Sequence, residues 1–299
     1  MENMDIGDET GEFIFHQGKK RIYDVRIQHI SEDKKRYIEY GEDEMNKWRT
    51  TDTITTSKDL SLQMDVIYDQ GNYGSCTANA CAWSYQYLRR DFRPSRFFIY
   101  YNERWLDLLE GDNSVKIDDG STLEQGMKSL RRFGVVREGV YPYIPRNFWK
   151  RPNQNLYQAA KNNRVSEFYH VPQDIENMKR CIDNGYPFVF GIYVYTSYES
   201  TYTEQTGILR YPNRRFETLL GGHAIVAVGY DDEKQWIKFA NSYGRGWGDN
   251  GYGYIPYSYI LDSTLTDDLW VIKRMYQKPR HKKIRQKNMI KKVIVMKKK

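Results

Sequence analysis

The pattern of hydrophobic and polar positions predicts a helical first half and a strand-rich second half. Apolar side chains recur at helical spacing over residues 76–90. Two further helices are expected over residues 97–109 and 122–133, and Gly134 follows the second of them as a helix-ending glycine. The second half has short apolar segments typical of strands, at 188–195, 223–230, 235–240 and 252–255. Helices followed by strands predict an α+β protein of two lobes with a cleft between them.

Composition divides the 299 residues into a leader, a globular part and a tail. Residues 1–57 form a charged leader, whose first 18 residues hold five acids and no Lys or Arg. Residues 58–276 are expected to form the folded domain, with a helical lobe over about 70–165 and a β lobe over about 166–275. Residues 277–299 form a basic tail.

The net charge of +7 comes from this tail, which carries 11 Lys or Arg and no acid. The remaining residues hold 35 basic and 39 acidic side chains, so the globular part is not expected to bind nucleic acid. For the tail two readings stay open: a solvated segment, or a segment that contacts a polyanion by releasing counterions.

No apolar run approaches the ~20 residues that a membrane span needs. The acidic amino terminus shows no secretory signal, and three cysteines do not make a disulfide framework. We therefore expect an intracellular protein in a reducing compartment, or one packaged in a particle if its origin is viral. The sequence does not predict the oligomeric state.

A predicted β-hairpin brings a histidine close to an asparagine. If Tyr230 pairs with Lys234 across a tight turn, His223 faces Asn241. An Asn beside a His can fix the orientation and tautomer of the imidazole through a hydrogen bond.

A Gly-rich loop, Asp69-Gln-Gly-Asn-Tyr-Gly-Ser-Cys76, leads directly into the first predicted helix. Cys76 then lies near the first turn, where the helix dipole and the unpaired amides favour a thiolate. The Cys76 amide and the Gln70 side chain could together bind an oxyanion. Nucleophile, base, orienting residue and oxyanion donor are all present in the sequence.

These residues resemble the signature blocks of papain-like cysteine peptidases. The resemblance rests on residues 70–80, on Gly-Gly-His-Ala-Ile-Val-Ala-Val-Gly-Tyr230, and on Asn241-Ser-Tyr-Gly-Arg-Gly-Trp-Gly-Asp-Asn-Gly-Tyr252. A fourth stretch, 119–143, resembles the substrate-binding loop of that family and the helix after it. The blocks occur in the family's order and span about residues 60–275. The resemblance implies a papain-like fold with a helical lobe, an antiparallel β lobe and the active-site cleft between them.

The resemblance also implies a role for each catalytic residue. Cys76 attacks the peptide carbonyl, and His223 protonates the leaving amine. Asn241 orients His223, while Gln70 and the Cys76 amide bind the oxyanion. The residues expected to contact substrate are Gly120, Ser121, Gly222 and Trp247, of which Trp247 has internal packing as its alternative role. No metal or organic cofactor is implied, and the expected partners are protein or peptide substrates.

The sequence departs from the family pattern at a few positions. Thr77 stands where a Trp usually follows the nucleophile, and Tyr243 replaces the Trp that shields the His–Asn pair. Ser121 and Tyr73 replace a Gly and a disulfide Cys of secreted members. The Gly-Ser-Cys-Thr-Ala-Asn form resembles bacterial and large-DNA-virus members more than lysosomal enzymes. The 57-residue leader is shorter than a lysosomal prosegment, and we interpret it as an atypical propeptide.

The preferred hypothesis is a cysteine endopeptidase, because no paired-His insertion of the kind found in some dipeptidase relatives is present. A catalytically silent module that binds peptides or builds a particle is the first alternative. An acyl-transfer enzyme acting on Gln side chains is the second.

Overall fold

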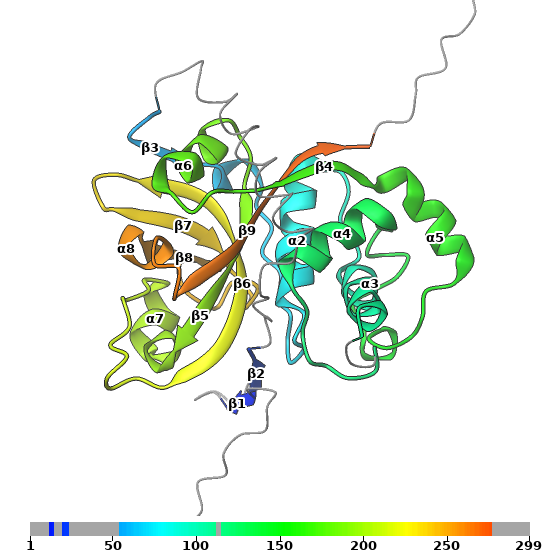
Figure 1. Cartoon of the computed structure of the whole chain (residues 1–299), viewed down its shortest axis with the longest axis horizontal. Helices are drawn as coiled ribbons and strands as arrows, with labels where there is room; N and C mark the ends of the chain where they lie inside the picture. Colours follow the sequence, from blue (N-terminus) through cyan, green and yellow to red (C-terminus); the bar gives the residue numbers. More distant parts are fainter. Residues whose placement is uncertain (1–11, 15–19, 24–53, 112–114, 277–299) are drawn as a thin grey trace, which may run out of the picture.

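The computed structural model describes residues 12–14, 20–23, 54–111 and 115–276, and divides them mainly into two lobes (Figure 1). The predicted basic tail and most of the predicted leader lie outside these residues. In the part of the chain that is described, no helix is long and apolar enough to cross a membrane.

The helical lobe is built on three helices, α2 (Cys76–Leu88), α3 (Arg96–Leu109) and α4 (Leu123–Arg132). Side-chain caps set two of the starts, because Ser95 accepts from the Phe98 amide and Thr122 from the Gln125 amide. Shorter elements complete this lobe and the segment before it: α5 (Gln154–Ala160) and the 3-10 helices η1 (Ser61–Gln63), η2 (Pro145–Asn147) and η3 (Lys161–Asn163).

The second lobe contains a seven-stranded sheet with strand order β4-β9-β5-β6-β7-β8, and β3 pairs with β6. All of its pairings are antiparallel. The strands are β3 (Ser57–Asp59), β4 (Val165–His170), β5 (Phe188–Tyr195), β6 (Leu219–Asp231), β7 (Trp236–Ala240), β8 (Tyr252–Pro256) and β9 (Thr266–Met275). Helices α6 (Ile175–Asp183), α7 (Thr201–Thr206), α8 (Tyr257–Ile260) and η4 (Thr196–Glu199) complete this lobe.

Helix α2 joins the two lobes, because it packs on α3 and α4 on one side and on β6 on the other. Its residues from Cys76 to Tyr87 are all buried, so α2 has no polar face turned to solvent. Buried side chains of both lobes form one continuous core around it. The arrangement places the start of α2 at the junction of the lobes.

A separate short hairpin pairs β1 (Glu12–Ile14) with β2 (Lys20–Ile22). Figure 1 shows β2 between the two lobes, at the lower edge of the view. Tyr23, directly after β2, is buried. Part of the predicted leader therefore contacts the folded domain.

The predicted α+β class is confirmed, with helices first and antiparallel strands second. The three predicted helices and four predicted strands are all present, and Gly134 follows α4 with a left-handed φ of +76°. The predicted boundary between leader and domain, after residue 57, falls within β3. Strands β4 and β9 were not predicted.

Candidate active site

Helix α2 begins at Cys76, whose side chain is fully buried. Cys76 is the first residue of the helix, and amides of the first helical turn have no acceptor within the helix itself. The turn is held by Asn79, whose amide nitrogen donates to the Ser75 carbonyl (2.8 Å). The structure therefore places Cys76 at the start of the first helix, as the sequence predicted.

Tyr143 holds the loop before α2 in place through two hydrogen bonds. The Tyr143 hydroxyl donates to the Gln70 carbonyl (2.8 Å) and bonds the Ser75 hydroxyl (2.6 Å). In addition, the Asp118 carboxylate accepts a hydrogen bond from the Gly74 amide (3.1 Å). These contacts fix the loop at three points, so its conformation does not depend on glycine alone.

Arg96 supports the same loop from the start of α3. Its guanidinium donates to the Asp69 carbonyl (2.8 Å) and pairs with Glu138 (2.8 Å). It also lies 3.8 Å above the centre of the Tyr143 ring. Because Arg96 is only 6% exposed, this ion pair is shielded from water on most sides.

The Gln70 side chain has a defined orientation. Its Oε1 accepts from the Ser242 hydroxyl, and its Nε2 donates to the Tyr73 carbonyl (2.8 Å). An amide nitrogen carries two hydrogens, so the second N–H is the one suited to an oxyanion. The main chain repeats the link between the two loops, because the Gln70 amide donates to the Ser242 carbonyl (2.9 Å).

His223 and Asn241 are joined by a hydrogen bond of 2.8 Å between Nε2 and Oδ1, and both side chains are buried. Asn241 Oδ1 also accepts from the Ser242 amide (2.8 Å), while Asn241 Nδ2 donates to the Tyr198 hydroxyl (3.2 Å). The oxygen of Asn241 therefore faces the imidazole, and Nε2 is the ring nitrogen that donates. Proton exchange with a reacting group is left to Nδ1.

The predicted contact between His223 and Asn241 is confirmed, but the predicted hairpin register is wrong. Tyr230 pairs with Ile237, not with Lys234, and a β-bulge separates the pairings of Ala227 and Gly229. The turn is therefore longer than assumed, and the bulge shifts the register again toward the site. The longer turn and the bulge were both missing from the prediction, and they displace the register in opposite directions. Their effects partly cancel, and His223 and Asn241 are still within hydrogen-bonding distance.

Aromatic rings enclose the imidazole. Tyr243 stacks on His223 with ring centres 4.8 Å apart, so it occupies the predicted shielding position. Tyr198 meets His223 edge to face at 6.0 Å. Trp247 is only 1% exposed and stacks on Tyr198 at 6.0 Å. This burial and stacking favour the packing alternative for Trp247, and its contact with substrate stays a prediction.

The other three predicted substrate-binding residues lie on both sides of the junction. Gly120 has a φ of +73°, and its amide donates to the Tyr100 hydroxyl (3.2 Å). The buried Ser121 hydroxyl donates to Asp107 (2.7 Å), so this side chain serves the interior of the helical lobe. Gly222 pairs with Tyr193 in the sheet, one residue before His223. Their contact with substrate stays a prediction.

The two other thiols are poor nucleophiles. Cys81 and Cys181 are fully buried, and burial raises the pKa of both thiols well above the ordinary value. Neither is suited to supply a thiolate near neutral pH.

A buried carboxyl lies behind the nucleophile. Glu103 is fully buried, and its Oε2 accepts from the Thr77 hydroxyl (2.8 Å). Burial raises the pKa of Glu103 to about 8, and the nearby carboxylate of Asp107 adds to the rise. Thr77, one of the predicted departures from the family pattern, therefore has a buried hydrogen-bond partner inside the lobe.

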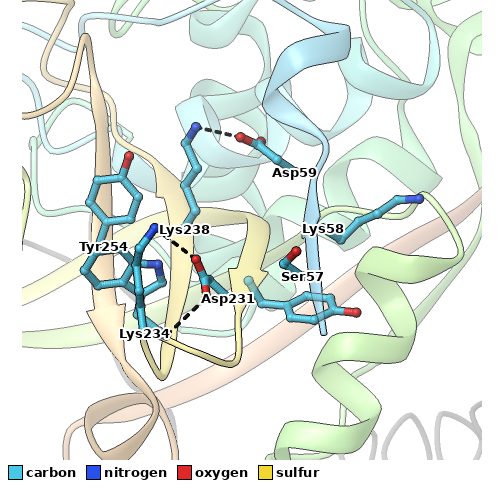
Figure 2. Close-up of a pocket in the computed structure, with 9 residues that line it drawn as sticks. Ser57, Lys58, Asp59, Asp231, Lys234, Lys238 and Tyr254 are labelled. Carbon is cyan, nitrogen blue, oxygen red and sulfur yellow. Dashed lines mark hydrogen bonds and ion pairs between the residues drawn. The ribbon is translucent and has the colours of Figure 1, made fainter. Parts of the chain in front are cut away.

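A surface hollow outside this site is lined by β3 and the β6–β8 strands. Figure 2 shows Lys238 directed to Asp59 and Lys234 directed to Asp231, while Lys58 points away from both. The two ion pairs measure 2.9 Å and 3.0 Å. Since the acids neutralise two of the lysines, the hollow does not present a cluster of cations to a ligand.

No group of three or more His, Cys, Asp or Glu suited to a metal ion occurs among the residues that the structure describes. The groups described at the junction are a thiol, an imidazole and amides, which are suited to nucleophilic attack, proton transfer and stabilisation of an oxyanion.

Sequence analysis missed the residues that support this site, namely Arg96, Tyr143, Tyr198 and Ser242. Only Ser242 carried a usable signal, because it directly follows Asn241. The others come from segments remote in sequence, and their contacts depend on the packing of the lobes.

Comparison with known families gives a match over residues 55–259 to the model of the papain family cysteine protease. A peptidase C1-like protein of Acanthamoeba polyphaga mimivirus is 37% identical over 221 residues, which is 69% of each chain. A cathepsin L-like proteinase of Fasciola hepatica is 28% identical over 211 residues, which are 69% of this chain and 57% of that proteinase.

Among solved structures, the chain is similar to xylellain, a cysteine protease from Xylella fastidiosa. The TM-score is 0.67 and the identity 37%, over 75% of this chain and 88% of xylellain. A digestive procathepsin L 3 of Tenebrio molitor larval midgut matches with a TM-score of 0.56 at 18% identity, over 73% of this chain and 70% of that one, which supports the fold alone.

Proposed function

Because the chain belongs to the papain family of cysteine proteases, we propose that it is an endopeptidase that hydrolyses peptide bonds through a Cys76 thiolate and a His223 imidazolium. Family membership explains the fold and the class of reaction. The assignment of individual residues rests on their contacts at the junction of the lobes.

In the proposed reaction, the Cys76 thiolate attacks the carbonyl carbon of the scissile bond. The carbonyl oxygen becomes an oxyanion beside the Cys76 amide and the Gln70 Nε2. His223 gives its Nδ1 proton to the leaving amine, and a thioester with Cys76 remains. His223 then takes a proton from water, which attacks the thioester, releases the acid and restores the thiolate.

The hydrogen bond between His223 Nε2 and Asn241 Oδ1 is the observation that carries this proposal. It directs Nε2 away from the reacting atoms and leaves Nδ1 as the ring nitrogen for proton transfer. The stacked Tyr243 ring covers the imidazole and limits access of water to this bond. A histidine that only packs in the core would not need a hydrogen bond to Asn241. It would also not need a loop nearby that fixes the orientation of the Gln70 side-chain amide.

The test compares the full chain with its Cys76→Ala variant, with Cys181→Ala as the matched control because it removes another buried thiol. Each is incubated with a fluorogenic peptide library and with an epoxysuccinyl peptide that alkylates activated thiols. We expect cleavage and labelling of Cys76 in the full chain and in Cys181→Ala, and neither in Cys76→Ala.

The same test is run on a Tyr23→Ala variant, because Tyr23 of the predicted leader is buried against the folded domain. If the full chain and this variant are both folded but show neither labelling nor cleavage, the proposal is rejected in favour of a silent peptide-binding module. Release of ammonia from Gln side chains without backbone cleavage would reject it in favour of acyl transfer.

A further inference from the structure

The predicted leader places one aromatic side chain directly against the catalytic histidine. Tyr23 is only 3% exposed although it lies outside the globular domain in sequence. Its ring meets His223 edge to face, with centres 6.2 Å apart at 88°, and meets Tyr198 at 6.2 Å and 86°. Such edge-to-face contacts are a preferred geometry for aromatic pairs.

A glycine makes room for this residue. A Cβ at Gly221 would lie 2.5 Å from the Tyr23 carbonyl oxygen and 2.8 Å from the Tyr23 Cβ. Gly221 also has a φ of +141°, which side chains rarely allow. The main chain and the side chain of Tyr23 therefore occupy space that any residue other than glycine at position 221 would fill.

The wall behind Tyr23 is rigid. Tyr198 is buried, stacks on Trp247 and accepts a hydrogen bond from Asn241. A ring fixed on two sides can receive another ring with little loss of conformational freedom. These contacts describe an aromatic pocket beside the imidazole, and Tyr23 occupies it.

The pocket lies on one side of the reacting atoms. Gly221 and His223 lie on β6 and Tyr198 lies on η4, so these walls come from the lobe that carries the imidazole. His223 is the group that protonates the leaving amine, so a residue held against it is the one that carries that amine. The pocket therefore belongs to the leaving-group side of the scissile bond.

We propose that Tyr198, Gly221 and His223 form a subsite for an aromatic residue on the leaving-group side of the substrate, and that Tyr23 is its resident competitor in the full chain. The proposal rests on the proposed function for the direction of the peptide. The chemical class of preferred substrate is a peptide with Tyr or Phe directly after the scissile bond.

The kinetic test measures which amine captures the thioester. A peptide methyl ester acylates Cys76 and releases methanol, and an added amino acid amide then competes with water to displace the Cys76 thiolate and form a new peptide bond. We compare tyrosinamide, phenylalaninamide and alaninamide in the full chain, in Tyr23→Ala and in Tyr23→Phe. Tyr211→Ala serves as control because Tyr211 is 49% exposed and contacts Asp262.

In Tyr23→Ala we expect tyrosinamide and phenylalaninamide to capture the thioester at least about tenfold better than alaninamide, a ratio that corresponds to about 1.4 kcal/mol. The full chain, Tyr23→Phe and Tyr211→Ala should all acylate several-fold more slowly than Tyr23→Ala, because the ring remains in the pocket. Equal capture of the three amides by an active enzyme would overturn the subsite.

A binding test separates this proposal from the catalytic one. In the Cys76→Ala, Tyr23→Ala double variant, fluorescence polarisation compares fluorescein-labelled hexa-alanine with the same peptide carrying one central Tyr. We expect at least about tenfold tighter binding of the Tyr peptide, reduced by Gly221→Ala or, if that variant does not fold, by Tyr198→Ala. Tighter binding by the double variant, combined with no ester hydrolysis by the folded Tyr23→Ala variant that keeps Cys76, would reject the endopeptidase and retain the pocket. Equal binding of the two peptides would reject the pocket.

Discussion

The hydroxyl of Ser242 donates a hydrogen bond to Oε1 of Gln70, while the Ser242 amide donates to Asn241 Oδ1. One residue thus orients both the Gln70 side-chain amide, which we propose binds the oxyanion, and the Asn241 side-chain amide, which holds the imidazole. The two halves of the candidate site are thereby aligned with each other, although they come from different lobes.

Ser242→Ala should lower kcat about tenfold and change KM little, because the Gln70 amide loses the bond that fixes its orientation. Removing an oxyanion donor itself costs about 10²–10³ in kcat, and Ser242 acts only through Gln70. Steady-state kinetics of the single and double variants measure this. When Gln70 is already replaced by Ala, the further change Ser242→Ala should lower kcat much less than it does in the native enzyme. If the two changes instead lower kcat by the product of their separate effects, Ser242 does not act through Gln70. Ser258→Ala, at an exposed position, is the control.

Asn241→Ala should lower kcat/KM about 100-fold, because His223 then loses the acceptor that holds Nε2. Cys76→Ala should remove activity altogether, since no other thiol replaces the nucleophile.

Tyr198→Phe removes the hydroxyl that accepts a hydrogen bond from Asn241 Nδ2. We expect this variant to lower kcat/KM less than about fivefold. Rates measured on one peptide substrate give this order. An Asn241→Ala variant as fast as the native enzyme would show that the bond does not serve catalysis.

Glu103→Gln should flatten the pH dependence of stability. The pKa of Glu103 is raised to about 8 by burial, from an ordinary value of 4.5. The folded protein retains a proton that the unfolded chain releases, so its free energy of unfolding falls as pH rises from about 4.5 to about 8. Gln stays neutral and removes this loss.

Urea unfolding at pH 5 and pH 8 measures the effect, with the exposed Glu233→Gln as control. The difference between the two pH values should be smaller in Glu103→Gln than in the native protein and in Glu233→Gln. The same difference in all three proteins would mean that Glu103 ionises without cost.

Arg96→Ala should destabilise the protein by roughly 3 kcal/mol, since it leaves the shielded Glu138 carboxylate without its cation. The exposed pair of Arg245 and Asp65 provides the comparison, and Arg245→Ala should cost less than about 1 kcal/mol. Chemical denaturation followed by tryptophan fluorescence measures both. Equal losses in the two variants would argue against a special role of Arg96 under the nucleophile loop.

The sequence predicted the parts of the fold that repeat a local pattern. Helices α2, α3 and α4 and strands β5 to β8 each carry their own periodicity, so they were found near their observed ends. Strands β4 and β9 are about 100 residues apart in sequence, and their pairing forms only when the whole sheet assembles. The hairpin register failed for a related reason, because a β-bulge leaves little trace in the sequence.

At the site, the residues with their own chemistry were found and those that support them were not. Cys76, His223, Asn241 and Gln70 stand in recognisable surroundings in the sequence. Tyr23 and Tyr198 do not, since a chain with 26 tyrosines gives no reason to select two of them. Only the structure brings these two rings to the histidine.

The two loops of the site are also tied by their backbones. The Gln70 amide donates to the Ser242 carbonyl, and the Gly244 amide donates to the Tyr68 carbonyl, each at 2.9 Å. Because these bonds join the two loops beside Cys76, we expect the loops to keep their relative position when a substrate binds. A substrate of the proposed peptidase would then enter as an extended strand and not as a folded globule. We therefore expect native proteins to be cut only where they unfold locally, so that the stability of the target, as much as its sequence, determines where it is cleaved.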